Sequence, residues 1–146
     1  MTSLERPFAW TSGPTPRPTA EDIAAVRATV LDYFEGWFDG DPVRMDRALH
    51  PLLAKRSWAQ DLARTPALAT TTAEQMVLFT SRGNGRTLGG DEQRLDIDVV
   101  EVSGTIATVV VHSDAYVEYL HLVSTPDGWR IVNGLWRYAD GRGPIR

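Results

Sequence analysis

The hydrophobic period of the chain changes once, near residue 93, and this change restricts the folds that the sequence can form. Before it, apolar residues recur at helical spacing, most clearly from Ile23 to Phe38. After it, apolar and polar residues alternate, as in Leu95-Asp96-Ile97-Asp98-Val99. Helices followed by a run of strands predict an α+β domain, in which three helices pack on one face of an antiparallel sheet.

Capping residues and chain breakers predict where the three helices begin and end. The N-terminal capping pairs are Thr19 with Asp22, Asp41 with Pro42, and Thr72 with Gln75. The breakers are Gly40, His50-Pro51 and Gly83-Asn84-Gly85, after which Gly89-Gly90 extends the loop. Between the second and third helices, Leu52 to Trp58 could form a short strand, and the residues up to 71 resemble loop.

The second half predicts four strands joined as a meander. The first strand begins at residue 93, and the other three cover residues 105–113, 115–125 and 129–138. After Val99 the apolar positions shift by one residue, to Val100 and Val102, and this break in the alternation predicts a β-bulge. Asp127-Gly128 predicts a hairpin turn, and a turn centred there would place Glu118 opposite Arg137.

The length of 146 residues suits one domain. Residues 1–18 contain four prolines and are expected to form an extended arm, followed by a folded domain over 19–138 and a short tail over 139–146. In the arm, Phe8 and Trp10 would either lie loosely or pin the arm to the domain. A lid over a pocket or a subunit contact is the alternative.

Composition excludes several classes of function. The chain has no cysteine, so thiolate chemistry and disulfides are absent, and its net charge of −4 with a single lysine, Lys55, argues against nucleic acid. We expect a cytoplasmic protein without a signal peptide or membrane span. We also expect no cofactor and no metal site, because His112 and His121 fall on opposite strand faces.

The candidate site residues are those expected to face the concave side of the sheet. Tyr33 and Trp37 lie four residues apart in the first helix and should point the same way, with ordinary core packing as the alternative. Glu118 is expected on a mainly apolar strand face, where it is either a catalytic carboxylate or the partner of Arg137 in a cross-strand ion pair. Trp58, Met76 and Asn133 are further candidate ligand-binding residues.

His50 allows two interpretations. Imidazole can gain or lose a proton near neutral pH, so His50 could act as a base or as a hydrogen-bonding group facing a ligand. Alternatively, it is a structural residue that closes the end of the second helix.

The opposite face of the sheet is also expected to be apolar, because Tyr119, His121 and Trp136 should lie on it. Three helices cover one face only, so a second subunit is the simplest cover for the other. The sequence therefore predicts a homodimer formed through this outer face.

Two strings carry a family resemblance: VRATVLDYFEGWFDGDPVRMDRALHP at residues 26–51 and YVEYLHLVSTPDGWRIVNGLWRY at residues 116–138. They resemble the putative lumazine-binding (SnoaL-like) branch of the NTF2-like superfamily. The resemblance implies a cone in which helices and a curved sheet enclose a pocket. Relatives include isomerases, polyketide cyclases, dehydratases and transport factors, so the fold does not fix the function.

Three functions follow as alternatives. The first is a protein that binds a flat aromatic or polycyclic small molecule in a partly apolar pocket. The second is a cofactor-independent lyase, cyclase or isomerase, with His50 or Glu118 as the base and Tyr33 as the proton donor. The third is a dimeric association module.

Overall fold

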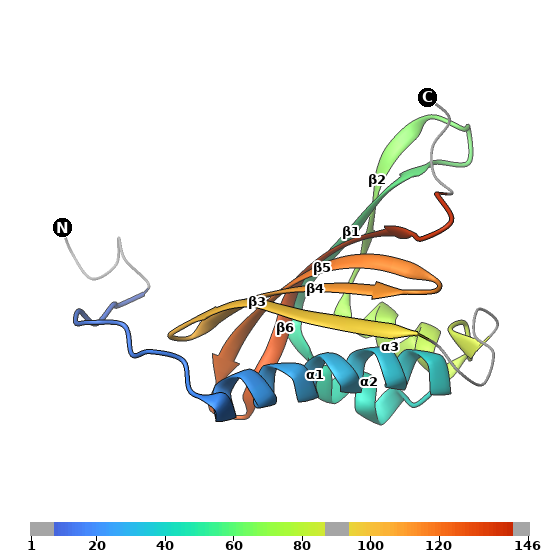
Figure 1. Cartoon of the computed structure of the whole chain (residues 1–146). Coiled ribbons are helices and arrows are strands. Elements are labelled where there is room, and N and C mark those ends of the chain that lie inside the picture. Colours follow the sequence, from blue (N-terminus) through green and yellow to red (C-terminus); the bar gives the residue numbers. More distant parts are fainter. Residues whose placement is uncertain (1–7, 87–93, 142–146) are drawn as a thin grey trace.

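The computed structural model describes residues 8–86 and 94–141 of the chain. In these residues three helices gather on one side of a six-stranded sheet, as Figure 1 shows. The helices are α1 (Ala20–Asp39), α2 (Pro42–Ala48) and α3 (Ala73–Ser81). The predicted α+β class with three helices is confirmed, whereas Gly89-Gly90 lies outside the described residues.

The helix ends follow the local rules that the sequence contains. Thr19 and Asp22 form a reciprocal capping box at the start of α1, and Thr72 and Gln75 form another at the start of α3. Gly40 ends α1 in the left-handed conformation, with a φ of 69°. None of the described helices is long and apolar enough to cross a membrane.

The sheet is mixed, with the strand order β2-β1-β6-β5-β4-β3. The strands are β1 (Leu49–Gln60), β2 (Pro66–Thr71), β3 (Leu95–Ser103), β4 (Ile106–Ser113), β5 (Tyr116–Thr125) and β6 (Gly128–Tyr138). β1 runs parallel to β6, and the other pairs of neighbours are antiparallel. The prediction of a purely antiparallel sheet is therefore wrong at one pair, because the chain passes through α3 and three more strands before β6 returns beside β1.

Residues 49–71 form a long hairpin rather than one short strand and a loop. β1 and β2 pair in register from Lys55 opposite Thr71 to Gln60 opposite Pro66. The Asp61 carboxylate accepts hydrogen bonds from the backbone amides of Ala63 and Thr65 and so stabilises the turn between the strands.

The hydrophobic core lies between α1 and the inner face of the sheet. From α1, Val26, Val30 and Phe34 are almost completely buried. The fully buried strand residues that meet them are Val109, Val111, Leu120, Leu122 and Ile131. Each such side chain contributes about 1.5–3 kcal/mol through burial.

Two β-bulges determine which side chains face the helices. The bulge in β3, between Val99 and Glu101, confirms the predicted slip of phase. A second bulge, between His121 and Leu122 of β5, was not predicted. The hairpin closes between Thr125 and Gly128, which moves the pairing by two residues from the predicted one, and the bulge takes back one of these. Glu118 therefore lies opposite Trp136 and not opposite Arg137.

The arm, described from residue 8 to residue 18, contains neither helix nor strand and is exposed throughout. Figure 1 shows it passing the turn between β3 and β4, where Thr15 comes close to Gly104, before it extends outward. Phe8 and Trp10 contact each other edge to face, with ring centroids 6.2 Å apart, and remain 70% and 78% exposed. They do not pin the arm to the domain.

Candidate functional site

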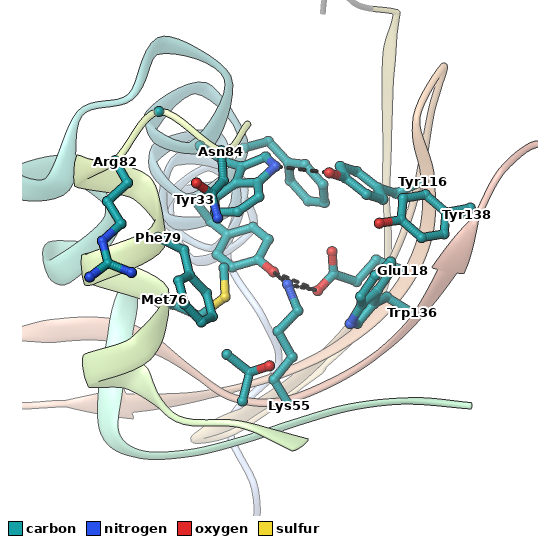
Figure 2. A pocket seen from close by; sticks show the side chains of 14 residues that line it. Tyr33, Lys55, Met76, Phe79, Arg82, Asn84, Tyr116, Glu118, Trp136 and Tyr138 are labelled. Atoms are coloured by element: carbon teal, nitrogen blue, oxygen red, sulfur yellow. Dashed lines mark hydrogen bonds and ion pairs between the residues drawn. The ribbon is translucent and has the colours of Figure 1, made fainter. Parts of the chain in front are cut away.

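A cavity of about 480 Å³ lies between α1, α3 and the inner face of β1, β5 and β6. Its walls are mainly aromatic, and its polar groups come from a few side chains (Figure 2). The lining residues are Tyr33, Phe34, Trp37, Lys55, Thr71, Met76, Phe79, Arg82, Gly83, Asn84, Tyr116, Glu118, Trp136 and Tyr138.

Three polar side chains meet at one side of this cavity: Tyr33 of α1, Lys55 of β1 and Glu118 of β5. The Tyr33 hydroxyl donates a hydrogen bond of 2.7 Å to Glu118 Oε1. Lys55 Nζ donates to Tyr33 Oη and forms an ion pair of 3.5 Å with Glu118 Oε1. The side chains of Lys55 and Glu118 are only 11% and 2% exposed, so the pair is largely removed from water. We call these three residues the polar triad.

Burial changes the acid–base properties of the polar triad. Desolvation lowers the pKa of Lys55 below its ordinary value of 10.5, and the nearby Glu118 carboxylate opposes this shift. Desolvation, with the negative charge of Glu118, raises the pKa of Tyr33 well above 10.0. Tyr33 therefore stays protonated in the folded protein, and the ammonium form of Lys55 is less favoured than it is in water.

Gly134 of β6 provides the space in which the charged pair lies. A Cβ atom at this position would lie 3.2 Å from Glu118 Oε1 and 3.5 Å from Lys55 Cγ. Since β6 lies between β1 and β5, a residue without a side chain allows Lys55 and Glu118 to meet across it.

Aromatic rings form the wall beside the polar triad, as the right side of Figure 2 shows. Tyr116 contacts Trp136 edge to face, with ring centroids 5.5 Å apart, and Trp136 contacts Tyr138 at 5.0 Å. Trp37 Nε1 donates a hydrogen bond of 3.0 Å to the Tyr116 hydroxyl and joins α1 to this wall. Lys55 Nζ lies 5.4 Å from the centre of the Trp136 ring, within the range of a cation–π contact.

The wall on the α3 side is formed by Met76, Phe79, Arg82 and Asn84 (Figure 2). Gly85 follows them and packs directly against α1: a Cβ atom there would lie 2.2 Å from the Trp37 carbonyl oxygen. The loop after α3 therefore lies close to the Trp37 backbone, and this contact positions Trp37 beside the cavity.

Four of the predicted site residues lie together. Tyr33, Trp37, Met76 and Glu118 all line the cavity, although they come from α1, α3 and β5. The helical spacing of Tyr33 and Trp37 and the period-two position of Glu118 were sufficient to place these side chains on the inner side.

Three predicted site residues do not line this cavity. His50 Nδ1 accepts a hydrogen bond of 3.0 Å from the backbone amide of Leu52, because the ring turns back along its own strand. Trp58 is 59% exposed on the outer side of β1. The bulge in the β5–β6 pair turns Asn133 to the outer face, where its side-chain amide lies 3.2 Å from His121 Nδ1. The expected grouping of His50, Trp58 and Asn133 with Tyr33 is therefore corrected.

The residues predicted for the outer face separate into two groups. Tyr119 is 54% exposed and His121 is also exposed, so both lie on the outer side as expected. Trp136 instead faces inward, because the same bulge reverses its direction. A second hollow, of about 460 Å³, lies near His121 and Asn133 on the outer side.

Lys55 and Trp136 are two of the lining residues that sequence reasoning missed. Lys55 is the single lysine of a chain rich in arginine, and it lies two residues from each of the buried residues Leu53 and Ser57, on the same face of the strand. A lysine on the buried face of a strand is unusual, and this pattern could have indicated it. For Trp136 the only signal was Gly134, because glycine inside a strand often marks a bulge.

Among residues 8–86 and 94–141, no group of three or more histidine, aspartate or glutamate side chains is arranged to hold a metal ion. The polar triad of the cavity consists of an ammonium, a phenol and a carboxylate. Together they can donate and accept hydrogen bonds, and they can exchange a proton.

Comparisons with known proteins identify the family of the chain. A family model described as putative lumazine-binding matches residues 21–137. No curated protein matches the chain.

Several solved structures share the fold. An NTF2-like protein of unknown function from Silicibacter pomeroyi DSS-3 is 20% identical, with a TM-score of 0.63 over 83% of this chain and 98% of that chain. An NTF2-like protein of unknown function from Shewanella baltica OS155 is 14% identical, with a TM-score of 0.69 over 84% and 98%. A ketosteroid isomerase-like protein from Erwinia carotovora atroseptica SCRI1043 is 15% identical, with a TM-score of 0.58 over 83% and 98%. These likenesses establish an NTF2-like fold.

Proposed function

The chain belongs to the putative lumazine-binding family, and from this membership we propose that its cavity binds a flat aromatic small molecule that carries hydrogen-bonding groups. The observation that carries the proposal is one cavity that combines aromatic walls with a buried polar triad of Tyr33, Lys55 and Glu118. Ligand sites commonly have this composition, with mainly apolar walls and a few polar groups that fix orientation.

The aromatic walls favour a planar ligand. Trp37 and Trp136 border the cavity from opposite elements, α1 and β6, and Tyr116 and Tyr138 continue the wall. Aromatic rings pack on one another by offset stacking or edge-to-face contact, and each pair contributes about 0.5–1.5 kcal/mol beyond burial. A volume of about 480 Å³ accommodates a molecule of two or three fused rings.

The polar triad favours a ligand edge with both a carbonyl group and an N–H or O–H group. The Lys55 ammonium can donate to a carbonyl oxygen, and the second oxygen of Glu118 can accept from an N–H. A pteridine-dione such as lumazine presents such an edge on a flat bicyclic ring. Hydrogen bonds to charged groups contribute about 1.5–3 kcal/mol each.

Titration with lumazine, followed by tryptophan fluorescence and by calorimetry, tests this proposal. We expect saturable quenching, because Trp37 and Trp136 line the cavity. Glu118→Gln should weaken binding roughly 10- to 100-fold through loss of a charged hydrogen bond. Trp58→Phe is the matched control, since Trp58 lies on the outer side and should leave affinity unchanged. Absence of saturable binding by lumazine and by other flat heterocycles would contradict the proposal.

A second candidate function is proton transfer on a bound ligand. It rests on the 2.7 Å contact between Tyr33 and Glu118, which places a donor beside a carboxylate inside the cavity. The ketosteroid isomerase-like neighbour shares the fold, and its name suggests proton transfer as a reaction to test here. Of the two candidate bases, His50 and Glu118, this version uses Glu118, which lines the cavity. Deuterium exchange into 2-tetralone, measured by NMR, should then fall roughly 10²–10⁴-fold in Glu118→Gln.

We also propose that the outer face is a contact between two copies of the chain. Tyr119 and Leu135 are 54% and 52% exposed on neighbouring strands, and they lie opposite each other in the β5–β6 pair. Light scattering at micromolar concentration tests this proposal. A dimer that dissociates in Tyr119→Lys is expected, and a monomeric wild-type protein would contradict it.

A further inference from the structure

We propose that Lys55 is an amine nucleophile that forms an imine with an aldehyde or ketone bound in the cavity, with Glu118 as its proton acceptor and donor. The inference rests on the proposed ligand site and assigns a chemical class to the ligand, a carbonyl compound on a flat aromatic framework. It gives Lys55 a catalytic role, since its nitrogen would form the covalent bond.

The position of Lys55 suits this role. It is the only lysine of the chain, its side chain is 11% exposed, and it lines the cavity rather than the surface. Its ammonium group lies 5.1 Å and 5.4 Å from the ring centres of Tyr33 and Trp136. A carbonyl compound stacked on these rings would place its carbonyl carbon near Nζ. The other 14 of the 15 Lys and Arg side chains of the chain are all arginines, which do not act as amine nucleophiles.

The surroundings of Lys55 provide a route for its proton. Lys55 Nζ donates to Tyr33 Oη, and Tyr33 Oη donates to Glu118 Oε1, so the three groups form a continuous hydrogen-bonded chain. Tyr33 can pass one proton to Glu118 while it takes one from Lys55, and it stays neutral throughout. The result is a free amine beside a protonated carboxyl.

Burial assists this transfer. Two opposite charges in a water-poor site lose hydration, and the neutral pair of amine and carboxylic acid avoids that loss. The pKa of Lys55, which desolvation lowers, agrees with it. A purely structural ion pair would require the charges alone, without an opening to a cavity of about 480 Å³.

The reaction is balanced in atoms and charge. The Lys55 amine attacks the carbonyl carbon, and a C–N bond forms while the carbonyl π bond breaks. The oxygen takes the proton held by Glu118, and the nitrogen then returns a proton to Glu118, which yields a neutral carbinolamine. Glu118 donates this proton to the departing hydroxyl, which leaves as water. Overall, the ammonium and the carbonyl compound give a protonated imine and one water, and Glu118 ends as a carboxylate.

Trapping with 2-naphthaldehyde and sodium cyanoborohydride tests the inference in the full-length protein. The reagent reduces the imine to a stable secondary amine, and peptide mass spectrometry then locates the label. The chain has one lysine, so the label falls on Lys55 or on the α-amine. We expect Lys55 of the folded protein to be labelled at least about tenfold faster than Lys55 of the protein unfolded in guanidinium chloride, because the cavity holds the aldehyde beside the amine.

Two variants distinguish activation of Lys55 by Glu118 from simple access of the reagent to Lys55. Glu118→Gln should slow labelling of Lys55 roughly 10²–10⁴-fold, the usual contribution of a positioned proton donor. The control Glu101→Gln, on an exposed part of β3, should not change it. If Glu118→Gln fails to fold, Tyr33→Phe interrupts the same hydrogen-bonded chain and should also slow the reaction.

A second probe distinguishes failure of this inference from failure of the proposed function. The alcohol 2-naphthylmethanol has the same ring system but cannot form an imine, and its binding is followed by tryptophan fluorescence. If the alcohol binds while Lys55 of the folded protein is labelled no faster than in guanidinium chloride, imine formation is refuted and ligand binding stands. If neither compound binds, both proposals are refuted.

Discussion

Tyr33 of α1 and Glu118 of β5 are 85 residues apart in sequence, yet a hydrogen bond of 2.7 Å joins the tyrosine hydroxyl to the carboxylate inside the fold. Both side chains are 2% exposed. Because neither has access to bulk water, each depends on the other and on Lys55 for its hydrogen bonds. The polar triad therefore couples the helical layer to the sheet, and several expectations follow from this coupling.

Removal of one charge from the triad should be strongly destabilising. Glu118→Ala leaves the Lys55 ammonium buried without its partner, and we expect a loss of about 3–5 kcal/mol in the free energy of unfolding. Urea denaturation measures this loss. Glu101→Ala, an exposed carboxylate on β3, is the control and should change stability by less than about 0.5 kcal/mol.

Replacing all three members with apolar residues should restore most of that stability. The triple variant Tyr33→Phe, Lys55→Met, Glu118→Leu leaves no buried polar group unpaired, so we expect it to approach the wild type. If it is as unstable as Glu118→Ala, the loss in the single variant comes from packing and not from an unpaired charge.

Stability should depend on alkaline pH through Tyr33. Its pKa is raised above 10.0 in the folded state, so above pH 10 the unfolded chain loses a proton that the folded chain keeps. The folded state then binds more protons, and stability falls as pH rises. Tyr33→Phe should show a shallower decline above pH 10 in denaturant titrations. Tyr119→Phe, on the outer face, should retain the wild-type slope, and an equal effect of both variants would contradict the assignment.

Lys55 should contribute the opposite slope at lower pH. Its pKa is lowered below 10.5 in the folded state, so just below pH 10.5 the unfolded chain binds the extra proton. Stability therefore rises with pH as it passes through the folded pKa toward 10.5. Lys55→Met should remove this rise when the free energy of unfolding is measured over the same pH series.

Two glycines should differ in their tolerance of alanine. At Gly85 a Cβ atom would lie 2.2 Å from the Trp37 carbonyl oxygen, and backbone cannot move aside. At Gly134 the nearest atom is the Glu118 carboxylate at 3.2 Å, which can shift slightly. We expect Gly85→Ala to cost about 1–3 kcal/mol and Gly134→Ala to cost less. Thermal denaturation of the two variants gives the order, and the reverse order would contradict this account of the α3 loop.

His50 should affect stability rather than binding. Its Nδ1 atom accepts from the Leu52 amide, and the ring does not line the cavity. We expect His50→Ala to lower the free energy of unfolding by about 0.5–1.5 kcal/mol, the usual contribution of one hydrogen bond. Lumazine affinity should stay unchanged in the same variant, and a large loss of affinity would return His50 to the site.

The features that the sequence predicted correctly are those set by neighbouring residues. The capping boxes at Thr19 and Thr72 form within one helical turn, so their signatures in the sequence are sufficient. The inward direction of Tyr33 and Trp37 follows in the same way from the period of the helix.

The features that the sequence missed depend on distant parts of the chain. The β5–β6 hairpin closes with Thr125 paired to Gly128, so Pro126 and Asp127 occupy the turn and the register there differs from the predicted one by two residues. The bulge beside His121 then reduces this difference to one residue. Gly134 was the only local sign of this bulge. The offset reversed the faces of Asn133 and Trp136. Asn133, predicted to line the pocket, lies on the outer face, and Trp136, predicted for the outer face, lines the cavity.

The neighbour relationship between β1 and β6 has a consequence for how the protein is made. β1 is synthesised early, and it pairs with β2 along one edge. Its partner along the other edge is β6, the last strand in the sequence. During translation the edge of β1 that pairs with β6 therefore stays unpaired until residues 128–138 have left the ribosome. Lys55 lies on β1, so its ammonium group can pair with the Glu118 carboxylate only after β6 has been added between β1 and β5.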